Sequence, residues 1–105
     1  MDEAPRPEDC RTMAEVRRGV DATDRALIDL LAIRFAYMRA AARIKPDRGQ
    51  VRDEARKAEV IAAARALADG QGVPADVVAA LWEQLVEASI AYEGEHWDRI
   101  NRAPR

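Results

Sequence analysis

The residues with the clearest chemical potential are cations that recur along one predicted helix face. Steps of three and four residues from Arg17 reach Arg34 and end at Lys45, and most positions between them are apolar. A buried, unpaired cation is costly, so each of these side chains needs a counter-charge. That counter-charge is either an acid of the protein or a small ligand with several negative charges.

The protein offers a simple alternative to a ligand. Each cation could extend to solvent or pair with one of four acids, Asp24, Asp53, Glu54 and Glu93. Several cations on one stripe nevertheless favour the ligand, because the chain has too few acids to pair with all of them in its interior. Both interpretations stay open for any single cation.

The spacing of the cations suggests how a ligand could be held. Arg34 and Lys45 are separated by about 20° around a helix and roughly 16 Å along it, so long side chains could bracket one small anion. Arg17 lies about 25 Å from Arg34 along the same helix. Arg17 can therefore serve the same ligand only from a second subunit.

Later segments add polar residues with equally simple alternatives. Arg56 follows Asp53 by one helical turn, and the two could form a surface pair. Ser89 and Glu93 are spaced for one face of a helix, where Ser89 could bond to its own backbone. Glu93 is the more informative residue, because its face is otherwise largely apolar. The apolar neighbours on that face are Trp82, Leu85 and Trp97.

Three helices are predicted to position these residues. Thr12 and Glu15 form a capping-box pattern at the start of the first helix. Pro46 ends this helix after Lys45, because proline disfavours the α conformation at the residue before it. The first helix is then roughly 33 residues and about 50 Å long.

Turn signals divide the rest of the chain. Residues 46–50 read as a loop, and a second helix runs from about Asp53 to Asp69, ended by Gly70 and Gly72. A third helix starts at Pro74 and continues to about Asn101. Residues 1–11 are predicted to be an extended N-terminal arm and residues 12–103 a helical domain. No strand pattern is convincing, so the fold class is all-α.

The predicted first helix is too long for a single compact chain. A domain of 105 residues has a radius of gyration of about 13 Å. Two shorter helices cannot cover the apolar stripe of a helix about 50 Å long. We therefore expect an intertwined homodimer in which long helices pack side by side. The alternative is an extended three-helix hairpin.

Composition narrows the class of protein further. The formal net charge is −2, so we expect no nucleic-acid partner. The single cysteine, Cys10, and the single histidine, His96, provide no internal disulfide and no metal set. No apolar run is long enough to span a membrane, and the first residues lack a secretory signal. We expect a cytoplasmic protein with no metal and no cofactor.

Four stretches of the sequence are similar to a known family. Three of them resemble the all-helical chorismate mutases: "EVRRGVDATDRALIDLLAIRFAYMRAAARIK", "VRDEARKAEVI" and "LWEQLVEASIAYE". The fourth, "PEDCRTMAEVR", resembles the related isochorismate pyruvate lyase branch. The resemblance covers nearly the whole chain and implies an enzyme that binds a small dianion, either chorismate or isochorismate.

The resemblance also implies a role for each cation. Arg17 matches the arginine that family members lend to the neighbouring subunit, and Arg34 matches one that binds a substrate carboxylate. Lys45 matches a lysine that contacts a carboxylate and the ether oxygen. Arg56 matches an arginine near the carboxylates.

The polar positions are implied in the same way, with two departures. Asp53 corresponds to a contact with the ring hydroxyl, and Ser89 to a serine that holds the ring carboxylate. Lys57 stands where bacterial mutases often have a glutamate for the hydroxyl. Glu93 stands where they usually have a glutamine that donates to the ether oxygen, so Glu93 would have to be protonated to act.

The chemistry accounts for this set of residues. Chorismate rearranges to prephenate through a pericyclic shift that needs no nucleophile or metal, only a folded dianion and donors aimed at the ether oxygen. The same site could expel pyruvate from isochorismate through a cyclic transition state. We expect a chorismate mutase of aromatic amino-acid biosynthesis, and the alternatives are an isochorismate pyruvate lyase and a non-catalytic helical dimerisation module.

Overall fold

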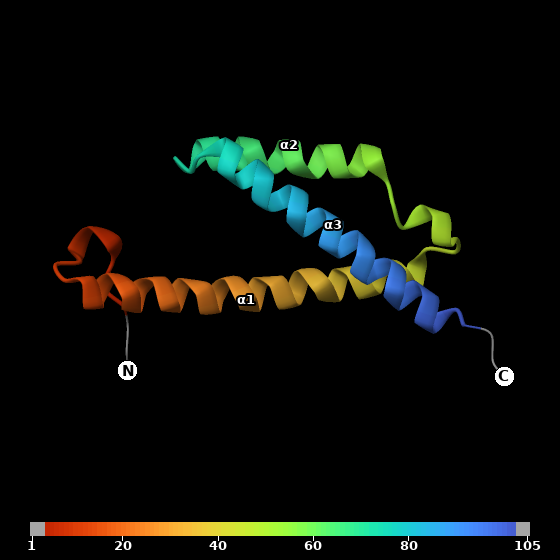
Figure 1. The fold of residues 1–105 in the computed structure, drawn as a ribbon, viewed down its shortest axis with the longest axis horizontal. Coiled ribbons are helices and arrows are strands. Elements are labelled where there is room, and N and C mark those ends of the chain that lie inside the picture. The colour runs from red at the N-terminus through yellow and green to blue at the C-terminus, as the bar shows by residue number, and fades with distance from the viewer. Residues whose placement is uncertain (1–3, 103–105) are drawn as a thin grey trace. The chain divides into compact units, whose positions relative to one another are not determined.

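The computed structural model describes residues 4–102, and these residues form helices joined by short connections (Figure 1). In chain order the elements are η1 (Pro7–Asp9), α1 (Met13–Ile44), η2 (Arg48–Gln50), α2 (Glu54–Gly70) and α3 (Ala75–Ile100). No strand occurs in residues 4–102, so the predicted all-α class with one very long helix is confirmed. Residues 1–3 of the predicted arm and residue 103 of the predicted domain lie outside the described residues. The chain divides after Ala36 into two compact units.

The first unit contains the start of α1 and the residues before it. The predicted capping box is confirmed, because the Glu15 backbone N–H donates to Thr12 Oγ1 at 3.1 Å and the Thr12 N–H donates to Glu15 Oε1 at 3.0 Å. The Arg11 N–H also donates to this carboxylate and contributes most to lowering the pKa of Glu15. Within the predicted extended arm, residues 7–9 form one turn of 3-10 helix, so the arm is not extended throughout.

Helix α1 ends at Ile44, one residue before the predicted end at Lys45, and Pro46 follows it closely. Its 32 residues correspond to about 48 Å of helix. Among these residues Ala42 alone is buried. Large apolar side chains of α1 are exposed in the single chain, and they include Leu27, Ile28, Leu30 and Ile33. This helix therefore carries more apolar surface than the single chain covers.

The connection after α1 is more ordered than the predicted loop. Residues 48–50 form the 3-10 helix η2, and the Asp47 N–H donates to Gln50 Oε1 at 3.2 Å. The side chain of Asp53 then caps α2, accepting from the Arg56 N–H at 3.0 Å. This cap satisfies one of the free N–H groups of the first turn and starts the helix where the sequence predicts it.

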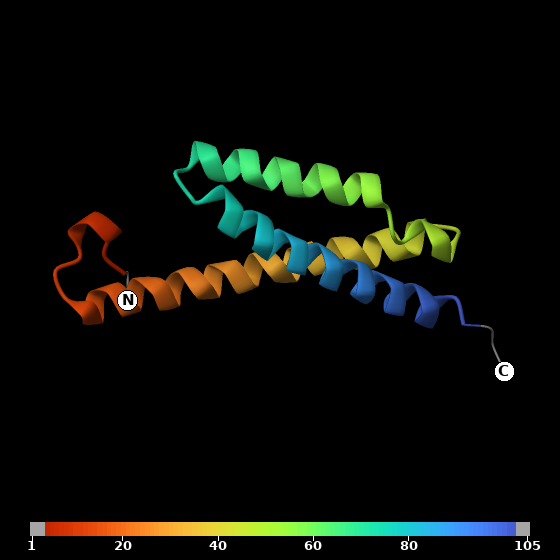
Figure 2. The same ribbon diagram turned by 45° about the horizontal axis from the view of Figure 1, so that its top comes forward.

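Helices α2 and α3 form a hairpin in the second unit (Figures 1 and 2). Gly72 has a φ of +70°, which glycine adopts without strain, and the Val73 N–H returns to the Ala68 carbonyl at 2.9 Å. Ala64 and Ala68 of α2 are buried, as is Val86 of α3. Gly94 does not shorten α3, which continues to Ile100.

Candidate active site

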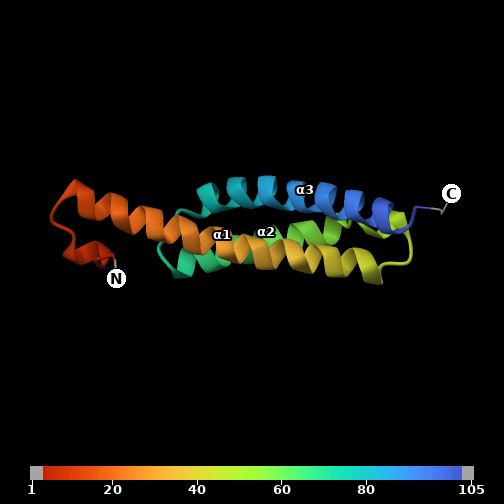
Figure 3. The same ribbon diagram turned by 90° about the horizontal axis from the view of Figure 1, so that it is seen from below.

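The centre of the candidate site is an ion pair between Lys45 and Glu93. Lys45 Nζ lies 2.7 Å from Glu93 Oε2, and Glu93 is only 4% exposed. The backbone carbonyl of Lys45 accepts a hydrogen bond of 2.9 Å from Trp97 Nε1. Two residues one turn apart on α3 thus hold both the side chain and the backbone of Lys45. Figure 3 shows the chain after α1 beside the C-terminal turns of α3.

A cavity of about 620 Å³ adjoins this lysine. Its lining residues are Ile44, Lys45, Pro46, Gln50, Arg52, Asp53 and Glu54. Lys45 and Asp53, two of the predicted site residues, therefore face the same space. The charged lining suits a small polar molecule. Of the two cations in this lining, Lys45 and Arg52, Lys45 is the one for which the family resemblance implies a substrate contact.

Ser89 and Glu93 are both buried on α3, one turn apart. Ser89 is 3% exposed, and its hydroxyl donates to the Leu85 carbonyl at 2.7 Å. The simple alternative for Ser89, a bond to its own helix, is therefore observed. Because Glu93 is paired with Lys45, the simple alternative for this lysine is observed as well. A ligand would have to compete with that pairing.

The second-helix arginine has a different partner from the one considered in the sequence. Arg56 donates to Asp53 through its backbone and not through its guanidinium. The guanidinium instead pairs with Glu59 at 3.0 Å, and both side chains are largely exposed. Arg56 also borders a mainly apolar cavity of about 430 Å³ together with Trp82. Its predicted contact with substrate stays a prediction.

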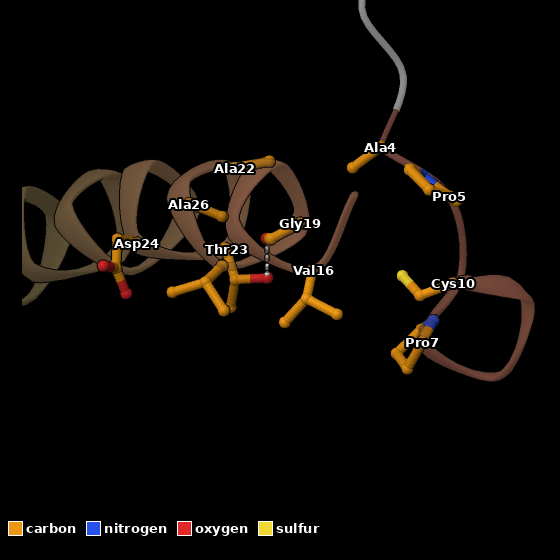
Figure 4. A pocket seen from close by; sticks show the side chains of 11 residues that line it. Ala4, Pro5, Pro7, Cys10, Val16, Gly19, Ala22, Thr23, Asp24 and Ala26 are labelled. Atoms are coloured by element: carbon orange, nitrogen blue, oxygen red, sulfur yellow. Dashed lines mark hydrogen bonds between the residues drawn. The ribbon is translucent and has the colours of Figure 1, made fainter. Parts of the chain in front are cut away.

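Arg17 and Arg34 belong to the first unit. Arg17 is exposed and Arg34 is half-buried, and both lie on α1. Within the same unit, residues 4–26 line a cavity of about 610 Å³ (Figure 4). Neither arginine lines this cavity, and its polar side chains are Cys10, Thr23 and Asp24. This space lacks the cations that a dianion needs, and the roles of Arg17 and Arg34 stay predictions.

Lys57 is held by two carboxylates of α3. Its ammonium pairs with Glu83 and lies 2.7 Å from Glu87 Oε2, and these contacts raise the pKa of Lys57. Arg52 forms a bidentate pair with the same Glu87, at 2.7 and 3.0 Å. Arg52 and then Lys57 lower the pKa of Glu87 to about 2. The positive charge of Lys57 is thus matched by protein acids.

These acids belong to a stripe along α3 that the sequence analysis missed. Glu83, Glu87 and Asp98 lie within about 60° around the helix, because spacings of four and eleven residues return to nearly the same face. They pair with three cations from residues 48–57. Two of these are Arg52 and Lys57, and the third is Arg48, whose Nε lies 2.8 Å from Asp98 Oδ1. The spacing of these acids is visible in the sequence, but the cations with which they pair are not.

Comparison with known proteins identifies the family of this chain. Residues 16–94 match the family described as chorismate mutase type II. The chain belongs to this family. The resemblance predicted from the sequence is confirmed, and all of the predicted site residues, from Arg17 to Glu93, lie inside the matched range.

A curated relative of this chorismate mutase family member belongs to the lyase branch. The isochorismate pyruvate lyase of Pseudomonas aeruginosa is 29% identical over 97 residues, which cover 92% of this chain and 96% of the relative. Family and relative together indicate an enzyme of the chorismate mutase and isochorismate pyruvate lyase kind, acting on a chorismate-like substrate. Within residues 4–102, no helix combines the length and apolar character that a membrane span requires.

Proposed function

We propose that this protein is a chorismate mutase that converts chorismate to prephenate in aromatic amino-acid biosynthesis. The observation that carries the proposal is the pairing of Lys45 with a buried carboxylate, Glu93, at 2.7 Å. In the family resemblance both residues face the ether oxygen of the substrate. Negative charge grows on this oxygen as the C–O bond breaks, so donors placed there stabilise the transition state more than the ground state.

Binding of a dianion would change the partners within this pair. A substrate carboxylate competes with Glu93 for the Lys45 ammonium, and two buried anions side by side repel each other. Proton uptake by Glu93 removes that repulsion and converts the residue from an acceptor into a donor. In this mechanism Lys45 binds the carboxylate and ether oxygen, while protonated Glu93 donates the second hydrogen bond to the ether oxygen.

The second candidate is an isochorismate pyruvate lyase. The curated relative from Pseudomonas aeruginosa favours it. Loss of pyruvate from isochorismate also proceeds through a cyclic transition state in which the ether C–O bond breaks. The same cations and the same donors would serve both reactions.

We also propose that the active form is a homodimer in which each chain lends Arg17 to the other chain's site. Support comes from α1, which has one buried residue in 32 and exposes large apolar side chains such as Leu27 and Ile28. A second copy would cover this surface and would bring a distant Arg17 to Lys45. The proposed ligand carries two negative charges, which Arg17, Arg34 and Arg56 would neutralise.

Two incubations test the function. Purified protein is mixed separately with chorismate and with isochorismate, and the products are identified by chromatography. Prephenate from chorismate supports the mutase, whereas salicylate and pyruvate from isochorismate support the lyase. If neither substrate is consumed, the chain is a non-catalytic helical module and the proposal fails. Lys45→Ala is the control for contaminating enzymes of the expression host.

A further inference from the structure

Gly94 on α3 is covered by the side chain of Arg48. A β-carbon placed on Gly94 would lie 2.7 Å from Arg48 Nη2 and 2.9 Å from its Cζ, so the guanidinium lies directly against the helix. The same guanidinium pairs with Asp98, with Nε 2.8 Å from Oδ1. Glycine inside a helix is less favourable than alanine, and the close approach of Arg48 explains why a residue without a side chain occupies this position. Any side chain here would displace Arg48.

The contact attaches the connection after α1 to α3 close to the candidate site. Arg48 follows Lys45 by three residues, and Gly94 directly follows Glu93. Trp97, next to Asp98, holds the Lys45 carbonyl. The ion pair, the indole bond and the Arg48 contact therefore connect one short stretch of chain to one end of α3.

We propose that Arg48 is a positioning residue for Lys45. Its guanidinium, seated on Gly94 and bonded to Asp98, fixes the direction in which the chain leaves α1 and so keeps the Lys45 ammonium at Glu93. One of the two residues between Lys45 and Arg48 is Pro46, whose ring restricts φ. A displacement of Arg48 is therefore transmitted to Lys45. This inference rests on the proposed function, in which Lys45 contacts the substrate.

The seat and the charge contribute separately to this attachment. The side chains of Arg48 and Asp98 are 52% and 53% exposed, and an exposed ion pair alone contributes little to stability. Packing of the planar guanidinium on a bare helix surface adds contact that an ammonium cannot reproduce. Substitutions at Gly94 and at Asp98 test the two parts independently.

Two variants and two matched controls separate these effects. Gly94→Ala displaces the guanidinium. Gly70→Ala adds the same atom at a position where, apart from its chain neighbours and the backbone of its own helix, no atom of residues 4–102 lies within 4 Å. Asp98→Asn removes the charge partner of Arg48, whereas Asp76→Asn removes the partner of Arg65 elsewhere on α3. Thermal unfolding identifies any variant that has lost its fold.

The readout is the rate at which acetic anhydride acetylates each lysine, measured by mass spectrometry. Lys45 and Lys57 are the lysines of this sequence, so Lys57 is an internal reference. Gly94→Ala and Asp98→Asn should raise the Lys45 rate about two- to fivefold, the range expected when an exposed ion pair is lost. The Lys57 rate should not change, because Glu83 and Glu87 remain in place. Glu93→Gln is the positive control, since it releases Lys45 directly.

Activity provides the second readout. With either substrate, Gly94→Ala and Asp98→Asn should lower kcat more than they raise KM. The kcat of Arg48→Lys should lie between the kcat of these variants and that of wild type. An unchanged Lys45 rate in both variants, with Glu93→Gln responding, overturns the proposal. A raised rate with unchanged kcat in an active enzyme also overturns it, because Arg48 would then hold the chain without positioning a catalytic group. If wild type converts neither substrate, the proposed function fails, and the acetylation rates still decide whether Arg48 holds Lys45.

Discussion

Lys45 Nζ lies 2.7 Å from Glu93 Oε2, but the two partners are buried to very different degrees. The Glu93 side chain is 5% exposed and the Lys45 side chain is 29% exposed. Removal of the lysine therefore strands a carboxylate in the interior, whereas removal of the carboxylate leaves an ammonium that can reach solvent. This asymmetry makes the two residues separable by mutation.

Lys45→Ala should destabilise the protein at neutral pH by about 3 to 5 kcal/mol, because it leaves Glu93 buried without a counter-charge. Lys45→Ala with Glu93→Gln should recover much of that loss, since an amide is far less costly to bury than a charge. Urea unfolding at pH 7 measures both. Equal unfolding midpoints for the single and the double variant would show that Glu93 does not depend on Lys45.

Lys45 should also act on the chemical step. In the better-folded background with Glu93→Gln, Lys45→Ala should lower kcat by about 100- to 1,000-fold, the usual effect of losing one donor to a developing negative charge. Saturation kinetics separate kcat from KM. An unchanged kcat at saturation would limit Lys45 to binding of the ground state.

Glu93 should make the mutase reaction sensitive to pH. A glutamate donates to the ether oxygen only when protonated, so the activity of wild type should fall as pH rises. Glu93→Gln carries a permanent donor of nearly the same shape and should keep its activity at high pH. The measurement is kcat/KM from pH 5 to pH 9. Matching profiles for the two proteins would remove Glu93 from the ether oxygen.

A mixture of two inactive chains should regain activity if the proposed dimer shares its sites. In an Arg17→Ala and Arg34→Ala heterodimer, one site carries both defects and the other carries neither. Equal mixing after co-refolding should restore about a quarter of wild-type activity, because half of the dimers have one intact site of two. No recovery would place Arg17 in the site of its own chain.

The pairing of Glu87 with Arg52 and Lys57 should stabilise the fold in a pH-dependent manner. The pKa of Glu87 is lowered from 4.5 to about 2, so its contribution is present above pH 4.5 and is lost as pH falls towards 2. Glu87→Gln should lower Tm at pH 7, and the difference from wild type should shrink below pH 4.5. Glu59→Gln, which removes a pair within α2, is the matched control. A constant difference across this range would contradict the prediction.

The sequence by itself determined the helices and their ends. Thr12 with Glu15 and Pro46 act through the backbone within one turn, so their effects are visible in local spacing. The family resemblance singled out Lys45 and Glu93, because it depends on residue types at fixed positions, which are also visible in the sequence. Local signals were weaker inside the connection after α1, where one turn of 3-10 helix replaces the predicted loop.

Tertiary structure alone decided which side chains meet when they lie far apart in the chain. Glu93 was one of four acids considered as partners for the cations, and packing of α3 against the end of α1 selected it for Lys45. The same packing placed the guanidinium of Arg48 against Gly94, a contact that the sequence did not predict. These partners are 46 to 48 residues apart in the chain, and their distance depends on how whole helices pack, which no local spacing encodes.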